Sequence, residues 1–349
     1  MSEAVVLVGG KGTRLRPLTA STPKPLLPVA GVPFLQHQFA LARAAGITRI
    51  VLATSYRAEL FEDAFGDGRE LGVELVYVTE DEPLGTGGGI RNVADVLQSG
   101  PGDPVTILNG DILSGHDLRA QLAAHRATGA AVTLHLVEVD DARAFGCVPT
   151  DDDGRVTAFL EKMPEPVSHQ INAGCYVFDR AVIDSIAPGR RVSVERETFP
   201  ELLASGADVR GFVETAYWLD LGTPEAYVRG SADLVSGVIA SPAVPAHDGD
   251  SLFLPGAVVD PTAVIRGGTV IGRGAVVGAG AVVDGSVVQD GASVGAGARV
   301  VASALGRDAH VAAGAVVESC VVGDRGAVDV DQRPPPSTRI GCDERYPAS

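Results

Sequence analysis

Short runs of β-branched residues alternate with amphipathic stretches along the first third of the chain. The pattern predicts strands near residues 4–8, 50–53, 73–78 and 105–108, and helices near residues 34–45, 58–65 and 87–97. Alternation of this kind is typical of an α/β fold with a doubly wound, mostly parallel sheet and helices on both faces. Ligands of such sheets bind at the carboxyl ends of the strands, so the loops that follow the strands are the first candidates for a site.

The pattern changes after residue 130, where strands follow one another with few helices between them. Strands are predicted near residues 131–139, 156–161 and 171–178, and a helix near residues 224–239. The next segment, SPAVPAHDGDS, is rich in proline, glycine and polar residues, as linkers are. We therefore expect one domain over residues 1–240 and a linker over residues 241–252.

A repeat begins at residue 253, where an aliphatic residue recurs about every six positions. Val270, Val276, Val282 and Val287 follow this spacing, with glycines or other small residues between them. This is the hexapeptide signature of a parallel β-helix, in which each coil buries its aliphatic side chains against the next coil. The spacing predicts a β-helix domain over residues 253–325. The repeat fades after Val322 and a proline run appears, so we expect residues 326–349 to be poorly ordered.

Charge and cysteine content narrow the class of protein. The formal net charge of -16 would repel nucleic acid and anionic membrane surfaces, so neither is expected as a partner. The 4 cysteines lie far apart without CxxC spacing, which argues against a disulfide framework or a zinc site. No stretch approaches the ~18 consecutive apolar residues of a membrane span. The N-terminus lacks a signal-peptide pattern, and we expect a cytoplasmic protein.

A glycine-rich loop with the sequence LVGGKGTRLRPLTASTPKP follows the first predicted strand. Its glycines would allow backbone N–H groups to wrap around a polyphosphate; they are Gly9, Gly10 and Gly12. Leu15 stands where a dinucleotide fingerprint requires its third glycine, and a Walker A loop is absent. Arg14 and Lys24 add two cations that could stabilise a transferring phosphoryl group.

Further motifs recur in a fixed order along the chain, namely EDEPLGTGGG, NGDILSG, FGCV, FLEK, INAGCY and WLDLGTPE. Together with GGKGTRLRPLT and PKP, they resemble the sugar-nucleotide pyrophosphorylase family over residues 4–240. Within it, they are most similar to bacterial mannose-1-phosphate guanylyltransferases with a C-terminal left-handed β-helix. The resemblance implies a Rossmann-like nucleotide-binding fold, GTP and a sugar 1-phosphate, here mannose 1-phosphate, as substrates, and Mg²⁺ as cofactor.

The resemblance also implies roles for individual residues. Asp111, at the end of a predicted buried strand, and Asp220 correspond to the metal ligands, and their hard oxygens suit Mg²⁺. Arg14 and Lys24 correspond to the catalytic cations. The nucleotide-binding positions are Leu7, Gly9, Gly10, Gly12, Thr13, Glu80, Pro83, Gly85 and Thr86, and the sugar-phosphate positions are Gly146, Glu161, Lys162, Asn172 and Gly174.

The choice of base is predicted from Glu80, which stands where thymidylyl- and uridylyltransferase relatives carry a glutamine. A carboxylate at this position could accept hydrogen bonds from guanine N1–H and the 2-amino group together. Adenine offers no such pair of donors. The chain is therefore expected to use GTP.

Three alternatives remain open at this point. One is nucleotidyl transfer to a different sugar 1-phosphate such as a heptose 1-phosphate, because the same scaffold serves both. Another is a non-catalytic regulatory subunit that binds a sugar nucleotide. The third is an acetyltransferase built on the β-helix, with His310 as the base. We favour an oligomerisation role for the β-helix and expect a homo-oligomer.

Overall fold

The computed structural model describes residues 2–10, 12–55, 57–161 and 164–347. The chain forms two compact units, of which one contains Met1–Gly10 and Gln38–Trp218. The other contains Lys11–His37 and Leu219–Ser349. The region expected as one domain over residues 1–240 is therefore divided between the units, because residues 11–37, which contain the glycine-rich loop beyond Gly10, and residues 219–240 belong to the same unit as the C-terminal repeats.

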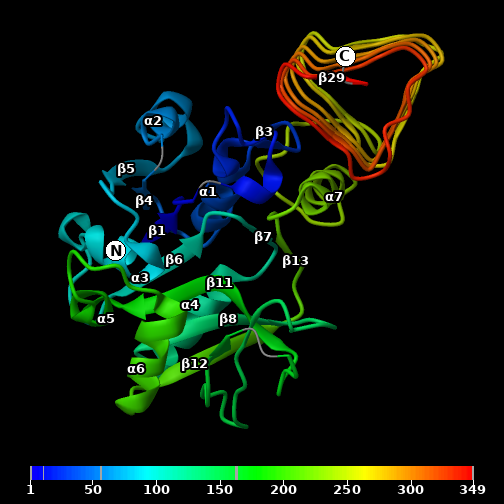
Figure 1. Cartoon of the computed structure of the whole chain (residues 1–349). Coiled ribbons are helices and arrows are strands. Elements are labelled where there is room, and N and C mark those ends of the chain that lie inside the picture. Colours follow the sequence, from blue (N-terminus) through cyan, green and yellow to red (C-terminus); the bar gives the residue numbers. More distant parts are fainter. Residues whose placement is uncertain (1, 11, 56, 162–163, 348–349) are drawn as a thin grey trace. The chain divides into compact units, whose positions relative to one another are not determined.

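The first unit is built on a sheet of nine strands among its described residues, with the order β10-β9-β11-β6-β1-β4-β5 and with β8 and β12 beyond β11 (Figure 1). The strands are β1 (Glu3–Leu7), β4 (Arg49–Thr54), β5 (Glu74–Thr79), β6 (Pro104–Asn109), β8 (Val132–Glu138), β9 (Gly146–Cys147), β10 (Leu160–Glu161), β11 (Gln170–Asp179) and β12 (Val209–Glu214). Strand β1 pairs in parallel with β4 and β6, and β4 pairs in parallel with β5. The predicted α/β fold with a mostly parallel sheet is confirmed.

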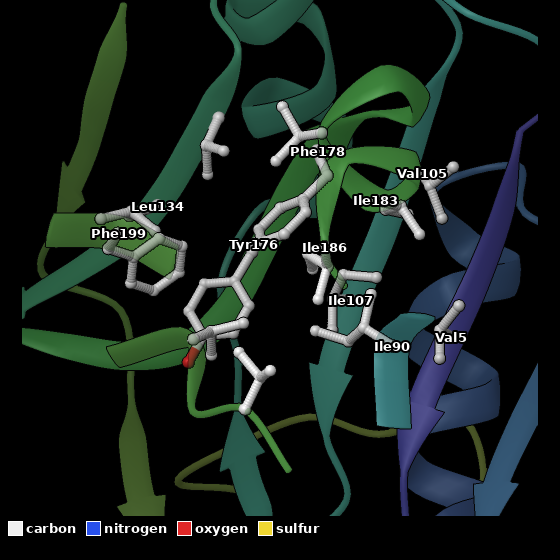
Figure 2. Packing of buried hydrophobic residues seen from close by; sticks show 14 of the residues in the cluster. Val5, Ile90, Val105, Ile107, Leu134, Tyr176, Phe178, Ile183, Ile186 and Phe199 are labelled. Carbon is white, nitrogen blue, oxygen red and sulfur yellow. The ribbon is translucent and has the colours of Figure 1, made fainter. Parts of the chain in front are cut away.

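Strand β11 joins this parallel part to the rest of the sheet by antiparallel pairing with β6 and β8. Two of its side chains, Tyr176 and Phe178, belong to a large apolar core, shown in Figure 2. Tyr176 and Phe178 of β11 pack edge-on against Phe199, with ring centroids 5.2 and 5.9 Å apart. Burying each of these side chains contributes about 2 kcal/mol or more, so this cluster fixes the register of β11.

Helices lie near the four positions that the periodicity predicts. They are α1 (Phe34–Ala44), α2 (Glu59–Phe65), α3 (Gly85–Asn92) and α7 (Pro224–Val235). The structure also has helices that were not predicted, namely α4 (Leu118–Thr128), α5 (Arg180–Ser185) and α6 (Phe199–Ala204). Helix α7 starts at a Thr223 cap and ends four residues before the predicted end, because Gly237 adopts a φ of 77° that turns the chain away. Within the described ranges, no helix combines the length and apolarity that a membrane crossing requires.

The second unit contains a parallel β-helix whose coils contribute one strand each to three sheets. The first sheet has the strands β14 (Leu252–Phe253), β17 (Val270–Ile271), β20 (Val287–Val288), β23 (Ala304–Leu305), β26 (Val321–Val322) and β28 (Arg339–Ile340). The second has β15 (Val258–Val259), β18 (Val276–Val277), β21 (Ser293–Val294), β24 (His310–Val311), β27 (Ala327–Val328) and β29 (Arg345–Tyr346), and the third has β16 (Val264–Arg266), β19 (Val282–Asp284), β22 (Arg299–Val301) and β25 (Val316–Glu318). Alanine and valine side chains alternate in its interior and are fully buried, as in Ala281 and Val283. The predicted β-helix is confirmed.

The same unit holds α7 and a short hairpin made of β2 (Pro28–Val29) and β3 (Val32–Pro33). Tyr227 of α7 is 1% exposed and donates its hydroxyl to the Pro28 carbonyl at 2.7 Å. The Gln289 side chain of the β-helix donates to the same hydroxyl at 3.3 Å. These contacts connect the β2–β3 hairpin, α7 and the β-helix.

The C-terminal segment differs from the expectation of a poorly ordered tail beginning at residue 326. Strand β28 pairs with β26, and β29 pairs with β27, so the ladder continues through Tyr346. Ile340 is 4% exposed and extends the apolar interior. The run Pro334–Pro336 lies where the third sheet would otherwise gain a strand. Because proline cannot donate a backbone hydrogen bond, this run interrupts one side of the coil and leaves the other two sides intact.

We predict that truncation after Val330 lowers the melting temperature by several degrees, because it removes β28 and β29 and exposes the coil beneath them. Loss of the buried Ile340 alone should cost about 2 kcal/mol. Thermal unfolding followed by circular dichroism measures the effect, and truncation after Tyr346 is the control. Equal melting temperatures for the two truncated chains would contradict the assignment of a final coil.

Candidate active site

The parallel strands of the first unit place several predicted residues at one edge of the sheet. Strand β1 lies between β4 and β6. The strands that follow β1 are added first on one side of it, as β4 and β5, and then on the other side, as β6. This is the switch point of a doubly wound sheet, where a crevice forms at the carboxyl ends of the strands. Leu7, Gly9 and Gly10 lie at the end of β1, and Asp111 follows β6.

The turn that carries Asp111 is held against the end of β1. Gly110 donates its N–H to the Leu7 carbonyl at 2.9 Å, and a Cβ at position 110 would lie 2.5 Å from that oxygen. Gln38 donates its side-chain amide to the Asn109 carbonyl at 2.7 Å. The amide oxygen of Gln38 accepts no hydrogen bond from the described part of the chain. A buried acceptor held against the turn that carries Asp111 suits a polar or cationic ligand.

Glu80 follows β5 at the same edge and stabilises the turn that leads into α3. One carboxylate oxygen accepts a hydrogen bond from the Leu84 N–H at 2.9 Å. The other lies over Gly89, where a Cβ would approach it to 2.7 Å. Burial raises the pKa of Glu80, while the Leu84 hydrogen bond opposes that shift. One oxygen of the Glu80 carboxylate therefore stabilises the turn before α3. The sequence did not indicate this role.

Gly85 and Thr86 begin α3, and Pro83 is exposed just before it. The Thr86 hydroxyl donates to a Glu195 carboxylate oxygen at 2.9 Å and accepts from the Val194 N–H at 3.0 Å. These two bonds connect the start of α3 to the segment before α6. Sequence reasoning missed Glu195, because nothing in the local pattern relates it to Thr86.

The strands β9, β10 and β11 bring the predicted sugar-phosphate positions together. Glu161 of β10 lies opposite Gly146 of β9, and the next residue of β9 pairs with the residue before Asn172. Lys162 lies outside the described residues. Four of the five predicted positions thus lie in one sheet, although they are spread over 29 residues of sequence from 146 to 174.

Asn172 and Gly174 form an irregular step in β11, where its register with β8 shifts. The Asn172 amide oxygen accepts from the Gly174 N–H at 3.1 Å, and its amide nitrogen donates to the Tyr176 hydroxyl at 2.8 Å. Gly174 has a φ of 77°, and a Cβ there would lie 2.8 Å from the Asn109 amide. Asn172 therefore maintains the bulge that opens β11 beside Gly174.

In the second unit, the glycine-rich loop folds back on itself. Gly12 adopts the left-handed conformation, and Thr13 opens a short 3-10 turn that ends at Leu15. The Thr19 hydroxyl donates to the Gly12 carbonyl at 2.8 Å. A Cβ at Gly12 would approach the Lys24 Cβ to 3.1 Å, so the two ends of the loop are closely packed.

This loop presents its two cations to one carboxylate. Lys24 Nζ lies 3.5 Å from one Asp220 oxygen, and an Arg14 nitrogen lies 3.8 Å from the other. Lys24 is 11% exposed and Arg14 is 67% exposed, so Lys24 is the more firmly placed of the two. Both distances exceed the ~2.8 Å of a strong charge-assisted hydrogen bond, and the Asp220 side chain is 27% exposed.

Gly222 is a residue that sequence reasoning missed. A Cβ at this position would lie 2.7 Å from an Arg14 nitrogen and 3.0 Å from an Asp220 oxygen. The glycine of WLDLGTPE therefore makes room for the Arg14 guanidinium. The motif contained the signal, but only the packing shows what the glycine does.

A second cluster, of His116, His135 and Glu214, lies in the first unit away from the predicted positions. Their possible ligand atoms lie within 4.8 Å of one another. The two imidazoles stack with centroids 4.1 Å apart and planes 18° apart. Because stacked rings direct their nitrogen lone pairs in parallel and not toward one point, this arrangement is a buried pair of neutral imidazoles.

Comparison with known protein families agrees with this geometry. The family model for nucleotidyl transferases matches residues 3–237. The chain belongs to the nucleotidyl transferase family. A second model, described as the GMPPB C-terminal domain, matches residues 247–332, which cover the β-helix except its last coil. The predicted family resemblance is confirmed.

Curated relatives extend over most of this nucleotidyl transferase. The mannose-1-phosphate guanylyltransferase of Mycobacterium tuberculosis is 59% identical over 262 residues, which are 75% of this chain and 72% of the relative. The mannose-1-phosphate guanylyltransferase catalytic subunit beta of Drosophila pseudoobscura pseudoobscura is 36% identical over 263 residues, covering 75% of this chain and 70% of the relative.

A solved structure resembles part of the chain. The crystal structure of HddC from Yersinia pseudotuberculosis matches with a TM-score of 0.57 and 29% identity. The match covers 66% of this nucleotidyl transferase and 98% of HddC. A crystal structure of HddC complexed with GMP-PN matches equally well.

We predict that Gly222→Ala lowers kcat/KM about tenfold or more, because the added methyl group displaces the Arg14 guanidinium from Asp220. The melting temperature should change by little, since the contact involves an exposed side chain. The matched control is Gly100→Ala, where the nearest atom to a Cβ lies 3.7 Å away. Wild-type kinetics for Gly222→Ala would show that Arg14 does not depend on this space.

The buried imidazole pair predicts acid sensitivity. Burial lowers the pKa of His116 to about 4, and burial together with repulsion from His116 lowers the pKa of His135 to about 2. Histidines of the unfolded chain take up protons near pH 6.5, so the unfolded state binds more protons as the pH falls from 7 toward 4. Stability is therefore present above pH 6.5 and is lost as the pH falls below it.

The free energy of unfolding should decrease between pH 7 and pH 5 by about 2 kcal/mol for each of these two imidazoles. Urea unfolding at several pH values measures the slope. The double substitution His116→Gln and His135→Gln should flatten it, whereas His310→Gln, at an exposed position, should leave it unchanged. A slope that survives the double substitution would assign the acid sensitivity to other groups.

Proposed function

We propose that this nucleotidyl transferase transfers GMP from GTP to mannose 1-phosphate, giving GDP-mannose and pyrophosphate. The observation that carries the proposal is the 59% identity to the mannose-1-phosphate guanylyltransferase of Mycobacterium tuberculosis over 75% of the chain. The cluster of Arg14, Lys24 and Asp220, together with the switch-point edge in the first unit, supplies groups suited to phosphoryl chemistry.

The reaction needs positioning and charge neutralisation more than proton transfer. A phosphate oxygen of the sugar 1-phosphate is anionic near pH 7 and attacks the α-phosphorus of GTP in line with the leaving group. One P–O bond forms and the bond to the β-phosphate bridging oxygen breaks, so that pyrophosphate leaves with the electron pair. In this proposal Lys24 contacts the α-phosphate, Arg14 contacts the departing pyrophosphate, and Lys162 holds the sugar phosphate.

Mg²⁺ is part of the proposal, with Asp111 and Asp220 as its protein ligands. The donors fit the ion, because both are carboxylates and the buried Gln38 amide oxygen near the Asp111 turn lacks a partner among the described residues. The Asp220 side chain is 27% exposed, and its contacts with Lys24 and Arg14 are 3.5 and 3.8 Å long. When bound, Mg²⁺ would neutralise the charge on the phosphate oxygens.

Glu80 is proposed to select guanine. Its carboxylate lies at the sheet edge, and one of its oxygens is not committed to the Leu84 hydrogen bond. Leu7, Gly9, Gly10, Gly12 and Thr13 would contact the nucleotide through backbone groups. Thr86 is proposed to act by holding the start of α3 near Glu80, since its hydroxyl bonds to Glu195 and Val194.

The sugar is proposed to bind beside the β11 bulge, where Gly146, Glu161 and Gly174 share adjacent strands. The glycines allow close approach of sugar hydroxyls to backbone groups. Trp218 supports this region by donating its indole N–H to the Ala173 carbonyl at 3.0 Å. Asn172 would act through the bulge that it maintains.

A homo-oligomer is proposed from the β-helix. Its first coil offers backbone groups that no coil precedes, and valines such as Val258 and Val264 are 60% and 46% exposed on its outer faces. Exposed strand edges and aliphatic faces favour association with another chain. Light scattering on the full chain tests this expectation, and a monomer at micromolar concentration would refute it.

The central test is a turnover assay that detects pyrophosphate. GTP with mannose 1-phosphate should give the highest kcat/KM among combinations of GTP, ATP, UTP and dTTP with mannose, glucose and heptose 1-phosphates. Chelation of divalent cations should abolish turnover, and added Mg²⁺ should restore it. Faster turnover with another sugar phosphate would replace mannose in the proposal, and an absence of turnover with every pair would refute transferase activity.

Glu80→Gln should reduce kcat/KM for GTP by a factor that corresponds to about 1 to 3 kcal/mol, because a neutral amide accepts poorly from two guanine donors. Activity with dTTP should fall less. The ratio of kcat/KM values for GTP and dTTP, measured in wild type and variant, isolates base selection from any effect on the Leu84 turn. Glu82→Gln, at an exposed neighbouring position, is the control. An unchanged ratio would remove Glu80 from base recognition.

A further inference from the structure

The final coils of the β-helix make a series of hydrogen bonds to the glycine-rich loop, all within the second unit. Arg339 of β28 donates from one guanidinium nitrogen to the Arg14 carbonyl at 2.8 Å and to the Arg16 carbonyl at 3.3 Å. The Cys342 thiol lies 3.7 Å from the Pro17 carbonyl. These contacts come from the C-terminal segment that the sequence pattern did not assign to the repeat.

The two preceding coils hold the next part of the same loop. Arg307 donates to the Thr22 hydroxyl at 2.9 Å and to the Ser21 hydroxyl at 3.2 Å. Ser21 in turn donates to an Asp324 carboxylate oxygen at 2.6 Å. Asp324 is 5% exposed, and its other oxygen accepts from the Arg307 N–H at 3.0 Å. Arg307, Asp324 and Arg339 thus contact the loop from three successive coils.

We propose that Arg339 is a positioning residue for the nucleotide, and that the last coil of the β-helix fixes the backbone from which the Arg14 side chain extends. The Arg14 side chain is 67% exposed, so packing does little to restrict it. Its carbonyl is instead fixed by a charge-assisted hydrogen bond, which is the stronger class of hydrogen bond. Arg339 does not contact the phosphates; it acts on them through Arg14.

The inference rests on the proposed function for its kinetic consequences, but the loop contacts themselves can be tested without activity. Hydrogen exchange on the full chain should be faster over residues 12–24 in Arg339→Ala than in wild type. The matched control is Arg345→Ala, because Arg345 belongs to the same coil and pairs with Asp329 at 2.6 Å within the β-helix. Unchanged exchange over residues 12–24 in Arg339→Ala would overturn the proposal.

Steady-state kinetics distinguish a positioning role of Arg339 from a general contribution to the stability of the chain. Arg339→Ala should raise KM for GTP by about fivefold or more while changing KM for mannose 1-phosphate less than about twofold. Arg339→Lys should recover part of the loss, because an ammonium group can also donate to a carbonyl. Arg345→Ala should match wild type. Equal increases of both KM values would indicate a structural role only and would overturn the positioning role.

A double substitution tests whether Arg339 acts through Arg14. In an Arg14→Ala background, Arg339→Ala should raise KM for GTP less than it does in wild type, because the guanidinium that it positions is absent. If the effects of the two substitutions on KM for GTP were fully additive, Arg339 would not act through Arg14 and the proposal would be refuted. If the wild-type chain showed no turnover with any substrate pair, the proposed function would fail, while the exchange experiment would still decide whether the last coil orders the loop.

Discussion

The placement of Arg14 and Lys24 depends on hydrogen bonds that hold the backbone of the loop between them. Leu15 and Leu18 anchor this loop, with 1% and 2% of their surface exposed. The carbonyl and hydroxyl groups beside them still need defined hydrogen-bond partners. Thr19 binds the Gly12 carbonyl, and Arg307 and Arg339 bind the segment from Arg14 to Thr22. The Asp220 carboxylate lies within 4 Å of both cations. Gly222 completes the arrangement by leaving space for one of them.

In the first unit, a buried apolar core fixes the positions of short polar turns. The cluster of Tyr176, Phe178 and Phe199 holds β11, and β11 holds β6, whose end carries the Asp111 turn. Some polar side chains near the candidate site stabilise the backbone of this unit. Glu80 caps the turn before α3, and Asn172 maintains the β11 bulge. A residue in a motif of this nucleotidyl transferase can therefore act by shaping the site as well as by contacting a ligand.

The β-helix contributes more than a stack of repeats. Its interior accepts alternating alanine and valine, which are small enough for successive coils to pair in register. Its outer surface can carry other residues: Arg307 and Asp324 lie in turns between strands, and Arg339 lies in β28. Residues 11–37 of the N-terminal region and the C-terminal coils consequently belong to one unit, although they are distant in sequence.

The sequence by itself determined the elements whose signal is local. The alternation of strands and helices, the six-residue repeat and the ordered motifs predicted the parallel sheet, the β-helix and the family, because each depends on periodicity or on residues close together in the chain. The sequence failed at Pro334–Pro336, where the loss of the repeat suggested disorder although the ladder resumes at Arg339. Only the tertiary structure decided the partners of Gly222, Thr86 and Arg339, because each contacts residues that are distant in sequence and carry no local pattern.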